Sequence, residues 1–583
     1  MNFYDDSPEW KWLFKNAIDW NLIIPLYYNF PTKDGFKDQN EVIDFLGELQ
    51  SSIAGWCAGP VADLAEDLDK LGSGEIVNDK TIYSDALKKL YQQGAELEIF
   101  GLNAPVEYGG LNAPYILNVL SLGFISRASM SACAQLSFSI SIIDMIHTVC
   151  KKEHSEKWIP KIMKGVASGC MAMTEADHGS DLGNMKTIAK VQKDGIYFIN
   201  GNKIFITNGG GGVAFVLSKT YGGKVGLKGL SLFFVEQVND DGTLNFRIAK
   251  NEHKMGLNGS FTCELVFENT IGHLIGKEGE GLELMLNLMN EARVSTAFQA
   301  LGGAEGALDF ATKYAHEREA FGKKIDQLPL MKRNLEDYHT ECDAIRALLV
   351  DTASHYNVFH FFTNKKYLTG DLNEEEEKTF IIAKIRIRKR TPLVKYYATE
   401  AGSILTQKAL FVLGGHGYMK EYPLERFVRD SFGPIVYEGT SQIQALMAMK
   451  DLLKYVMKNP QSFFANIVTA HPIAKSVQGA KPWEIQFQSL RYTFKKNLLK
   501  LLIKCLKPKN TEILNIKMWK TEKGIEQLMI HAETLCQGLS YLETLKVLRN
   551  HATKDETRYD LFKRYHNLVL PRLNSIYTDW DLR

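Results

Sequence analysis

The spacing of hydrophobic and polar residues divides the chain into consecutive stretches of different period. From the early aromatic residues to about residue 165 the apolar positions recur with a helical period, broken at Pro31, Pro60 and the turn-like segment 104–110. Between residues 168 and 272 the pattern changes to short β-rich runs separated by Asp-Gly, Asn-Gly and Gly-Gly turns. The pattern therefore predicts a helical unit followed by a small antiparallel β unit.

Helical periodicity returns at Gly279 and continues through residues 328–356 and 379–413, which predicts a helical bundle. Residues 357–373 are interpreted as a surface excursion, and the acidic run 374–377 as a solvated loop or a helix start. After Asn459-Pro460 a further helical tract runs to the last residue.

These changes of pattern predict an α+β fold of four units. The expected boundaries are 1–165 for an N-terminal helical domain with its extension, 166–275 for a middle β domain, 276–458 for a C-terminal helical bundle, and 459–583 for a helical extension. The most apolar stretch, 128–143, contains several serines and is too short and too polar to span a bilayer, so we expect a buried helix there.

Composition narrows the class of function. The 69 basic and 68 acidic residues give a net charge of +1, which disfavours nucleic acid as the main partner. The first residues lack the basic and apolar parts of a signal peptide, which predicts a cytoplasmic protein without a transmembrane segment. The 8 cysteines are scattered without a CxxC pair, and neither His178 nor His416 has a second ligand at metal spacing, so no metal site is expected.

Residues 171–187 (MAMTEADHGSDLGNMKT), named here the hydroxyl loop, form one candidate site. Thr174 and Ser180 carry hydroxyl groups after an expected strand, and Gly179 allows a close turn. This arrangement could line a planar cofactor. A loop capped by its own serine and aspartate is the alternative.

Residues 201–212 (GNKIFITNGGGG), named here the glycine segment, form a second candidate. They resemble a hairpin strand that ends in glycines and exposes backbone N–H groups. No GxGxxG sequence follows a strand in a βαβ setting, so a nicotinamide-binding Rossmann domain is disfavoured.

The third candidate is the loop-to-helix segment around Glu438. Pro434 blocks a helix before the glutamate, and Thr440 or Ser441 is the expected N-cap of the helix after it. The helix dipole would favour the ionised carboxylate, whereas an apolar substrate closing over it would raise its pKa. These opposed influences suit a general base, although a glutamate at this place could also be a plain capping partner.

Five segments, TEADHGSD, FITNGG, ATKYAHEREAFGKKI, LGGHGY with EYPLERFVRD, and YEGTSQIQ, occur in this order between Pro105 and Lys458. Together they resemble the acyl-CoA dehydrogenase family. The total length is similar to that of a long bacterial subgroup that includes 3-methylmercaptopropionyl-CoA dehydrogenases. The resemblance implies an N-terminal helical domain, a middle antiparallel β domain and a C-terminal helical bundle, here with a helical C-terminal extension.

By this resemblance the chain would bind FAD and oxidise an acyl-CoA thioester to the trans-2-enoyl thioester, with Glu438 as the base that removes the α-proton. An electron-transferring flavoprotein would accept the electrons, and a homodimer or homotetramer would complete the cofactor site. The implied cofactor-binding residues are Met173, Thr174, Gly179, Ser180, Phe205, Ile206, Thr207, Arg318, Phe321, Gly414, Gly415, Thr440 and Gln442. The implied substrate-binding residues are Ser180, Asn290, Arg293 and Gly439.

Two details refine these assignments. Arg318 and Phe321 match positions that contact the cofactor of a partner subunit. Ala292, just before Arg293, argues against the branch of the family that places its base at that helix position, which leaves Glu438 as the matching base.

Other functions remain open at this point. An acyl-CoA oxidase would use the same base and cofactor but react with oxygen. A member resembling the DNA-binding flavoprotein of the alkylation response would use a basic tail, and residues 495–509 are compatible with one. The same lysines could dock on a membrane surface or form a solvated helix face.

Overall fold

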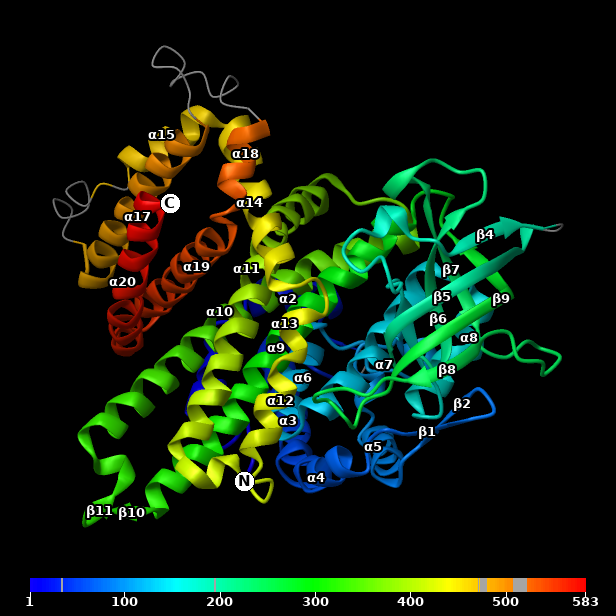
Figure 1. The fold of residues 1–583 in the computed structure, drawn as a ribbon, viewed down its shortest axis with the longest axis horizontal. Helices are drawn as coiled ribbons and strands as arrows, with labels where there is room; N and C mark the ends of the chain where they lie inside the picture. Colours follow the sequence, from blue (N-terminus) through cyan, green and yellow to red (C-terminus); the bar gives the residue numbers. More distant parts are fainter. Residues whose placement is uncertain (33–34, 193–194, 470, 472–479, 507–521) are drawn as a thin grey trace.

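The structure is a computed structural model that describes the chain except for residues 33–34, 193–194, 470, 472–479 and 507–521. Figure 1 shows three regions: long helices through the middle, a β sheet beside them, and a group of C-terminal helices on the side opposite the sheet. This arrangement confirms the predicted α+β fold, with helical, β and helical domains and a C-terminal extension.

The N-terminal region is helical, as its periodicity predicts, and it packs against the central bundle through α6 and α7. It also contains a two-stranded antiparallel hairpin that the pattern of apolar residues did not predict, β1 (Gly74–Val77) and β2 (Lys80–Tyr83). The helices are α1 (Pro8–Asn16), α2 (Trp20–Tyr27), α3 (Gln39–Trp56), α4 (Ala62–Lys70), α5 (Asp85–Glu96), α6 (Ile116–Ala128), α7 (Met130–Val149) and α8 (Lys152–Met163).

Helix α7 covers the apolar stretch for which a buried helix was expected. By length and composition alone it could cross a membrane, but 56% of its most apolar window is buried inside the protein. Helix α6, helix α9 (Gly281–Glu317) and strand β3 (Ser168–Ala172) pack around it. The contacts therefore agree with a core helix.

The middle domain is a seven-stranded sheet in the order β3-β6-β4-β5-β9-β7, with β8 paired to β9. The sheet is mixed and not purely antiparallel as predicted, because β6 pairs in parallel with both β3 and β4. Turn chemistry identifies hairpins between neighbouring strands but gives no signal for these crossover pairings. The strands are β3 (Ser168–Ala172), β4 (Ile188–Val191), β5 (Tyr197–Thr207), β6 (Gly212–Thr220), β7 (Leu230–Glu236), β8 (Arg247–Asn251) and β9 (Thr262–Ile275).

The central bundle consists of α9 (Gly281–Glu317), α10 (Pro329–Thr369) and α11 (Glu374–Val412). The predicted surface excursion at 357–373 is wrong for most of its length, because α10 continues to Thr369. Val358, Phe359 and Phe362 are buried and keep the helical face apolar. The acidic run begins α11, where Asn373 forms a capping box and the helix dipole favours negative charge.

The C-terminal extension packs against α10 and α11 of the bundle and against α14 (Ser441–Lys458). Its Lys504 donates hydrogen bonds to the carbonyl oxygens of Trp580 (2.9 Å) and Asp581 (2.8 Å) at the end of α20, so this lysine has a structural role. Residues 507–509 of the basic segment lie outside the described residues. The remaining helices are α12 (Leu424–Ser431), α13 (Gly433–Val436), α14 (Ser441–Lys458), α15 (Pro460–Val468), α17 (Pro482–Leu506), α18 (Glu522–Met529), α19 (Ala532–Lys554) and α20 (Tyr559–Leu582).

Candidate functional site

Glu438 lies in a short turn, residues 436–440, that joins α13 to α14 and is named here the glutamate turn. Its backbone is left-handed at two consecutive residues, with φ of 55° at Glu438 and 83° at Gly439. Thr440 is the N-cap of α14, because its hydroxyl accepts a hydrogen bond from the N–H of Ile443 at 3.4 Å. The predicted entrance of a helix directly after Glu438 is therefore confirmed.

The second of the two left-handed residues in the turn, Gly439, must be glycine. A Cβ on Gly439 would lie 2.7 Å from Nε2 of Gln444, and the positive φ disfavours any side chain. The Gln444 side chain uses this space to donate hydrogen bonds to the carbonyl oxygens of Glu438 (3.0 Å) and Gly439 (3.2 Å). The absence of a side chain at Gly439 thus allows Gln444 of α14 to hold the turn through these two hydrogen bonds.

Two buried cations bind the same stretch of backbone. Arg293 of α9 is 3% exposed, and its Nε donates to the carbonyl oxygen of Glu438 at 3.3 Å. Lys395 of α11 is 0% exposed, and its Nζ donates to the carbonyl oxygens of Gly439 (2.8 Å) and Ile435 (3.1 Å). Helices α9, α11 and α14 therefore all hold the glutamate turn by main-chain oxygens.

In the described structure these cations donate no hydrogen bond to the side-chain carboxylate of Glu438. Its Oε2 is buried and has no hydrogen bond within the described structure. Burial raises the pKa of Glu438, while the nearby charges of Arg293 and Lys395 oppose that rise. A carboxylate that is desolvated, unpaired and close to two cations is suited to accept a proton from a weak carbon acid.

The hydroxyl loop and the glycine segment lie against each other, as a shared cofactor site requires. The N–H of Ile204 on β5 donates to the carbonyl oxygen of Thr174 at 2.9 Å. The fully buried Lys203 donates to the carbonyl oxygen of Met173 (2.9 Å) and to Oε1 of Glu175 (3.0 Å). The ion pair Glu175–Lys203 therefore joins the two sequence segments.

Glu175 also organises the loop that follows it. Its carboxylate accepts the backbone N–H groups of Lys186 (2.5 Å) and Thr187 (2.9 Å). Although burial opposes ionisation, Lys203 and these hydrogen bonds lower the pKa of Glu175 to about 2. Glu175 is thus a permanently ionised structural carboxylate.

The surface beside these two segments carries an exposed aromatic ring. A register shift between Lys203 and Ile206 forms an irregularity in the pairing of β5 with β9. There Phe205 has a φ of 58° and is 61% exposed. Gly179 and Ser180 are exposed as well, whereas Ile206 is buried in the sheet domain. An exposed ring on a strand, next to exposed loop residues, offers a stacking platform for a planar group.

The other implied cofactor residues do not join this surface within one chain. Phe321 is 91% exposed between the short strands β10 (Glu319–Ala320) and β11 (Lys323–Lys324), and Arg318 directly before them is exposed too. Figure 1 shows these strands at the end of the long helices farthest from the sheet. A Cβ on Gly414 or Gly415 would meet no atom within 4 Å, so the double glycine faces open space. These positions are free to meet a second molecule.

Two more implied residues have partners inside the chain. Asn290 accepts a hydrogen bond from Nη1 of Arg293 at 3.1 Å, so the implied substrate pair lies beside the glutamate turn. Gln442 donates to Glu533 of α19 at 3.1 Å, which ties the start of α14 to the C-terminal extension.

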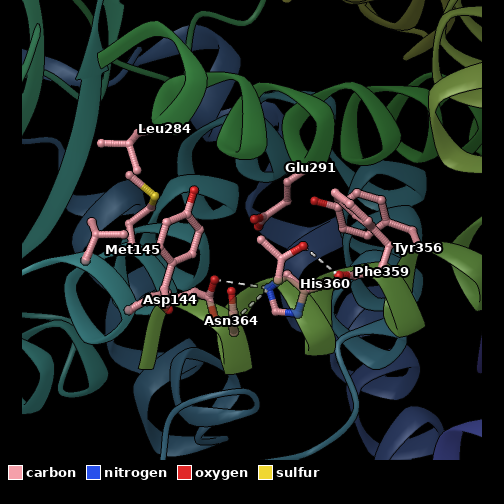
Figure 2. A pocket seen from close by; sticks show the side chains of 12 residues that line it. Asp144, Met145, Leu284, Glu291, Tyr356, Phe359, His360 and Asn364 are labelled. Atoms are coloured by element: carbon pink, nitrogen blue, oxygen red, sulfur yellow. Dashed lines mark hydrogen bonds and ion pairs between the residues drawn. The ribbon is translucent and has the colours of Figure 1, made fainter. Parts of the chain in front are cut away.

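A second buried cluster consists of Asp144 on α7, Glu291 on α9 and His360 on α10 (Figure 2), whose potential ligand atoms lie within 4.8 Å of one another. His360 bonds Asp144 (3.0 Å), and Ser141 donates to Glu291 (2.5 Å). The adjoining cavity has room for about 30 Å³, enough for one water-sized occupant. Burial and the charge of Asp144 raise the pKa of Glu291 to about 7.

A helical, β and helical fold with a glutamate turn held by two buried cations defines the class of protein, and comparison with known proteins identifies the family. Three family models match in order: the acyl-CoA dehydrogenase N-terminal domain at residues 48–166, the middle domain at 170–270, and the C-terminal domain at 279–363 and 370–453. The chain belongs to the acyl-CoA dehydrogenase family, whose members are FAD-dependent oxidoreductases.

Individual relatives agree with this family. The acryloyl-CoA reductase (NADH) of Anaerotignum propionicum is 34% identical over 62% of this chain and 86% of the relative. An acyl-CoA dehydrogenase of Bacillus subtilis is 34% identical over 63% of this chain and 89% of the relative. The structure of an acyl-CoA dehydrogenase complexed with FAD from Bacillus anthracis has the same fold, with a TM-score of 0.73 at 21% identity over 97% of this chain and 91% of that one.

Three residues of the site were missed by sequence reasoning. Gln444 lies inside the segment YEGTSQIQ, and Lys203 lies inside the glycine segment. The sequence around these two residues does not predict which groups they bond. Lys395 left a weak signal, because it is a single lysine among the apolar residues of PLVKYYA, where a solvated side chain is not expected.

Proposed function

We propose that this protein catalyses the α,β-dehydrogenation of an acyl-CoA thioester and that Glu438 removes the α-proton. The observation that carries the proposal is the buried, unpaired Oε2 of Glu438 in a turn held by two cations. The raised pKa of this carboxyl increases its strength as a base once it is ionised, and removal of an α-proton needs such a base in a desolvated site.

The product of the proposed reaction is the trans-2-enoyl thioester. FAD, when bound, supplies the acceptor for the hydride that leaves the β-carbon. Residues of the hydroxyl loop and of β5, among them Thr174, Ser180 and Phe205, would hold the cofactor at the exposed platform. Asn290, Arg293 and Gly439 would orient the substrate beside Glu438, and a donor to the thioester oxygen would stabilise the charge that develops there.

The proposal includes partners for the protein. Arg318, Phe321 and the double glycine would complete the cofactor site of a neighbouring subunit. Arg318 and Phe321 are exposed at strands β10 and β11, far from the sheet of their own chain, and the double glycine faces open space. A homodimer or homotetramer is therefore expected. An electron-transferring flavoprotein is the proposed electron acceptor, and the cytoplasm is the proposed location.

The direct test is anaerobic bleaching of the FAD-loaded protein by a panel of acyl-CoA thioesters. The panel covers short, long, branched and thioether acyl chains. The thioether is included because the length of this protein is similar to that of 3-methylmercaptopropionyl-CoA dehydrogenases. We expect rapid loss of the yellow colour with one class of chain and formation of its 2-enoyl-CoA. A protein that stays yellow with every thioester would contradict the proposal.

Experiments on the same FAD-loaded protein distinguish the alternative functions. Fast formation of hydrogen peroxide in air would select an acyl-CoA oxidase. Reduction of a 2-enoyl-CoA with no detectable oxidation of the saturated thioester would select a reductase. A salt-sensitive gel shift with duplex DNA would select the DNA-binding type, although Lys504 is already used to cap α20.

A further inference from the structure

Lys395 is an unusual lysine for its place in the fold. It lies in the middle of α11 with its side chain fully buried, between the buried residues Val394 and Tyr396. Burial of an ammonium group is costly unless polar groups replace its water. The groups that do so are the carbonyl oxygens of Ile435 and Gly439, both in or next to the glutamate turn.

The carboxylates near Lys395 do not pair with it directly. Charged groups reach it from three elements: Arg293 on α9, Glu400 on α11 itself, and Glu438 in the glutamate turn. Glu400 accepts a hydrogen bond from the hydroxyl of Ser441 at the start of α14. Lys395 therefore places a positive charge close to Glu438 without occupying either of its carboxylate oxygens.

The backbone of the turn needs such support. Glu438 has a φ of 55°, a conformation that is unfavourable for a residue with a long side chain and that persists only where the surroundings enforce it. Arg293 holds the carbonyl oxygen of Glu438, and Lys395 holds the carbonyl oxygens on either side of that residue. The three bonded carbonyl groups fix the direction in which the side chain leaves the turn.

We propose that Lys395 is the positioning residue of the active-site base: it holds the glutamate turn by its backbone and keeps a positive charge beside Glu438 while leaving the carboxylate free for substrate. The inference rests on the proposed function for its catalytic meaning. The electrostatic part does not, because it concerns two side chains of this protein in the absence of substrate.

Loss of the charge has a definite consequence. Lys395 opposes the rise in the pKa of Glu438 that burial causes. Without the charge we expect this pKa to rise by about one unit or more, the size of effect that a neighbouring charge has in a desolvated site. The pKa of Lys395 itself is lowered to about 8, mainly by burial, so the wild-type protein should lose the charge in the same way above that pH.

The test is a titration of Glu438 in the FAD-loaded protein by infrared difference spectroscopy, without any acyl-CoA. The Glu438 band is assigned by its absence in Glu438→Gln. Lys395→Gln keeps a hydrogen-bond donor and removes the charge, Lys395→Arg keeps the charge, and Lys384→Met removes an exposed lysine of the same helix as a matched control.

We expect the titration midpoint of Glu438 to rise by about one pH unit or more in Lys395→Gln and to stay within a few tenths in Lys395→Arg and Lys384→Met. An unchanged midpoint in folded Lys395→Gln would overturn the inference. If that variant does not fold, the wild-type protein provides the test. We expect a second shift of the Glu438 band near pH 8 that is absent in Lys395→Arg. A wild-type band that does not change through pH 8 would overturn the inference. Failure of the proposed function would appear separately, as a protein that no thioester bleaches.

Discussion

Two buried lysines of this molecule lie close to two glutamates but bind different groups: one binds a carboxylate, and the other binds backbone carbonyl oxygens. Lys203 bonds the carboxylate of Glu175 itself, at 3.0 Å, whereas Lys395 bonds the backbone on either side of Glu438. Both lysines are fully buried, and burial lowers the pKa of each to about 8. The cations are therefore alike, and the difference lies in what they bind.

The consequence for the two glutamates is large. The pKa of Glu175 falls to about 2, so this carboxylate stays ionised and serves to fasten the hydroxyl loop to β5. The pKa of Glu438 rises instead, and one of its oxygens remains unpaired. A buried cation on the carboxylate makes a structural glutamate, while a buried cation on the backbone leaves a glutamate available for proton transfer.

The largest expected effect comes from removing the free carboxylate. Glu438→Gln should slow reduction of the FAD by acyl-CoA by about a thousandfold or more, because a positioned base contributes factors of this order. The FAD content should stay close to that of the wild type, because the exposed platform is untouched. Stopped-flow absorbance measures the rate, and a variant that is reduced within tenfold of the wild-type rate would refute the role of Glu438.

The next largest effect concerns the structural pair. Lys203→Met should destabilise the protein by about 3–5 kcal/mol, because it leaves the buried carboxylate of Glu175 without its counter-charge. Adding Glu175→Gln should recover part of this loss. Urea unfolding measures both, with the exposed Lys190→Met on β4 as the control. Equal stability of Lys203→Met and the control would show that the pair is not coupled.

A third glutamate extends the comparison. Within the described residues Glu291 has no lysine partner, and its pKa is raised to about 7 from an ordinary value of 4.5. The folded protein then holds a proton that the unfolded chain releases, so the free energy of unfolding should fall as pH rises from 4.5 to 7 and stay lower above 7. The rise of about 2.5 pKa units corresponds to a loss of at most about 3–4 kcal/mol, at about 1.4 kcal/mol per unit.

Glu291→Gln should remove this contribution and be more stable than the wild type at pH 8 but not at pH 5. Unfolding at the two pH values, with the exposed Glu283→Gln of the same helix as the control, checks the sign. A variant that loses stability equally at both values would contradict the raised pKa.

The smallest effect concerns the cap that ends the glutamate turn. Thr440→Ala removes the side-chain acceptor for the N–H of Ile443 and should cost about 1 kcal/mol of stability. Thermal unfolding measures it against Ser489→Ala, an exposed change on α17. No loss relative to that control would mean that the turn is held by Lys395, Arg293 and Gln444 without the cap.

Much of the architecture could be predicted from the sequence, because periodicity and turn residues report local structure. They identified the helical and β regions and the helix start after Glu438, with Thr440 or Ser441 as its expected cap, of which the structure uses Thr440. They failed where structure depends on partners distant in sequence. The parallel pairing of β6 with β3 and β4 has no local signature, and α10 continues past Tyr356 because Val358 and Phe359 are buried by other elements.

The site shows the same limit. Motif residues such as Glu438 and Gly439 could be chosen in advance, because they lie in the segment YEGTSQIQ, which resembles a segment of the family. Lys395 could not, because it acts through carbonyl oxygens 40 and 44 residues away in sequence, and any residue supplies a carbonyl. Residues that support a site through the backbone leave almost no trace in the sequence.

In the proposed reaction Glu438 takes a proton from the carbon next to the thioester. Exchange of that proton with D2O, measured by mass spectrometry of acyl-CoA recovered from the anaerobic FAD-loaded protein, tests it without reference to any later electron transfer. We predict deuterium at the α-carbon with the wild-type protein and no exchange above the buffer rate with Glu438→Gln. Exchange at the wild-type rate in Glu438→Gln would show that another group is the base.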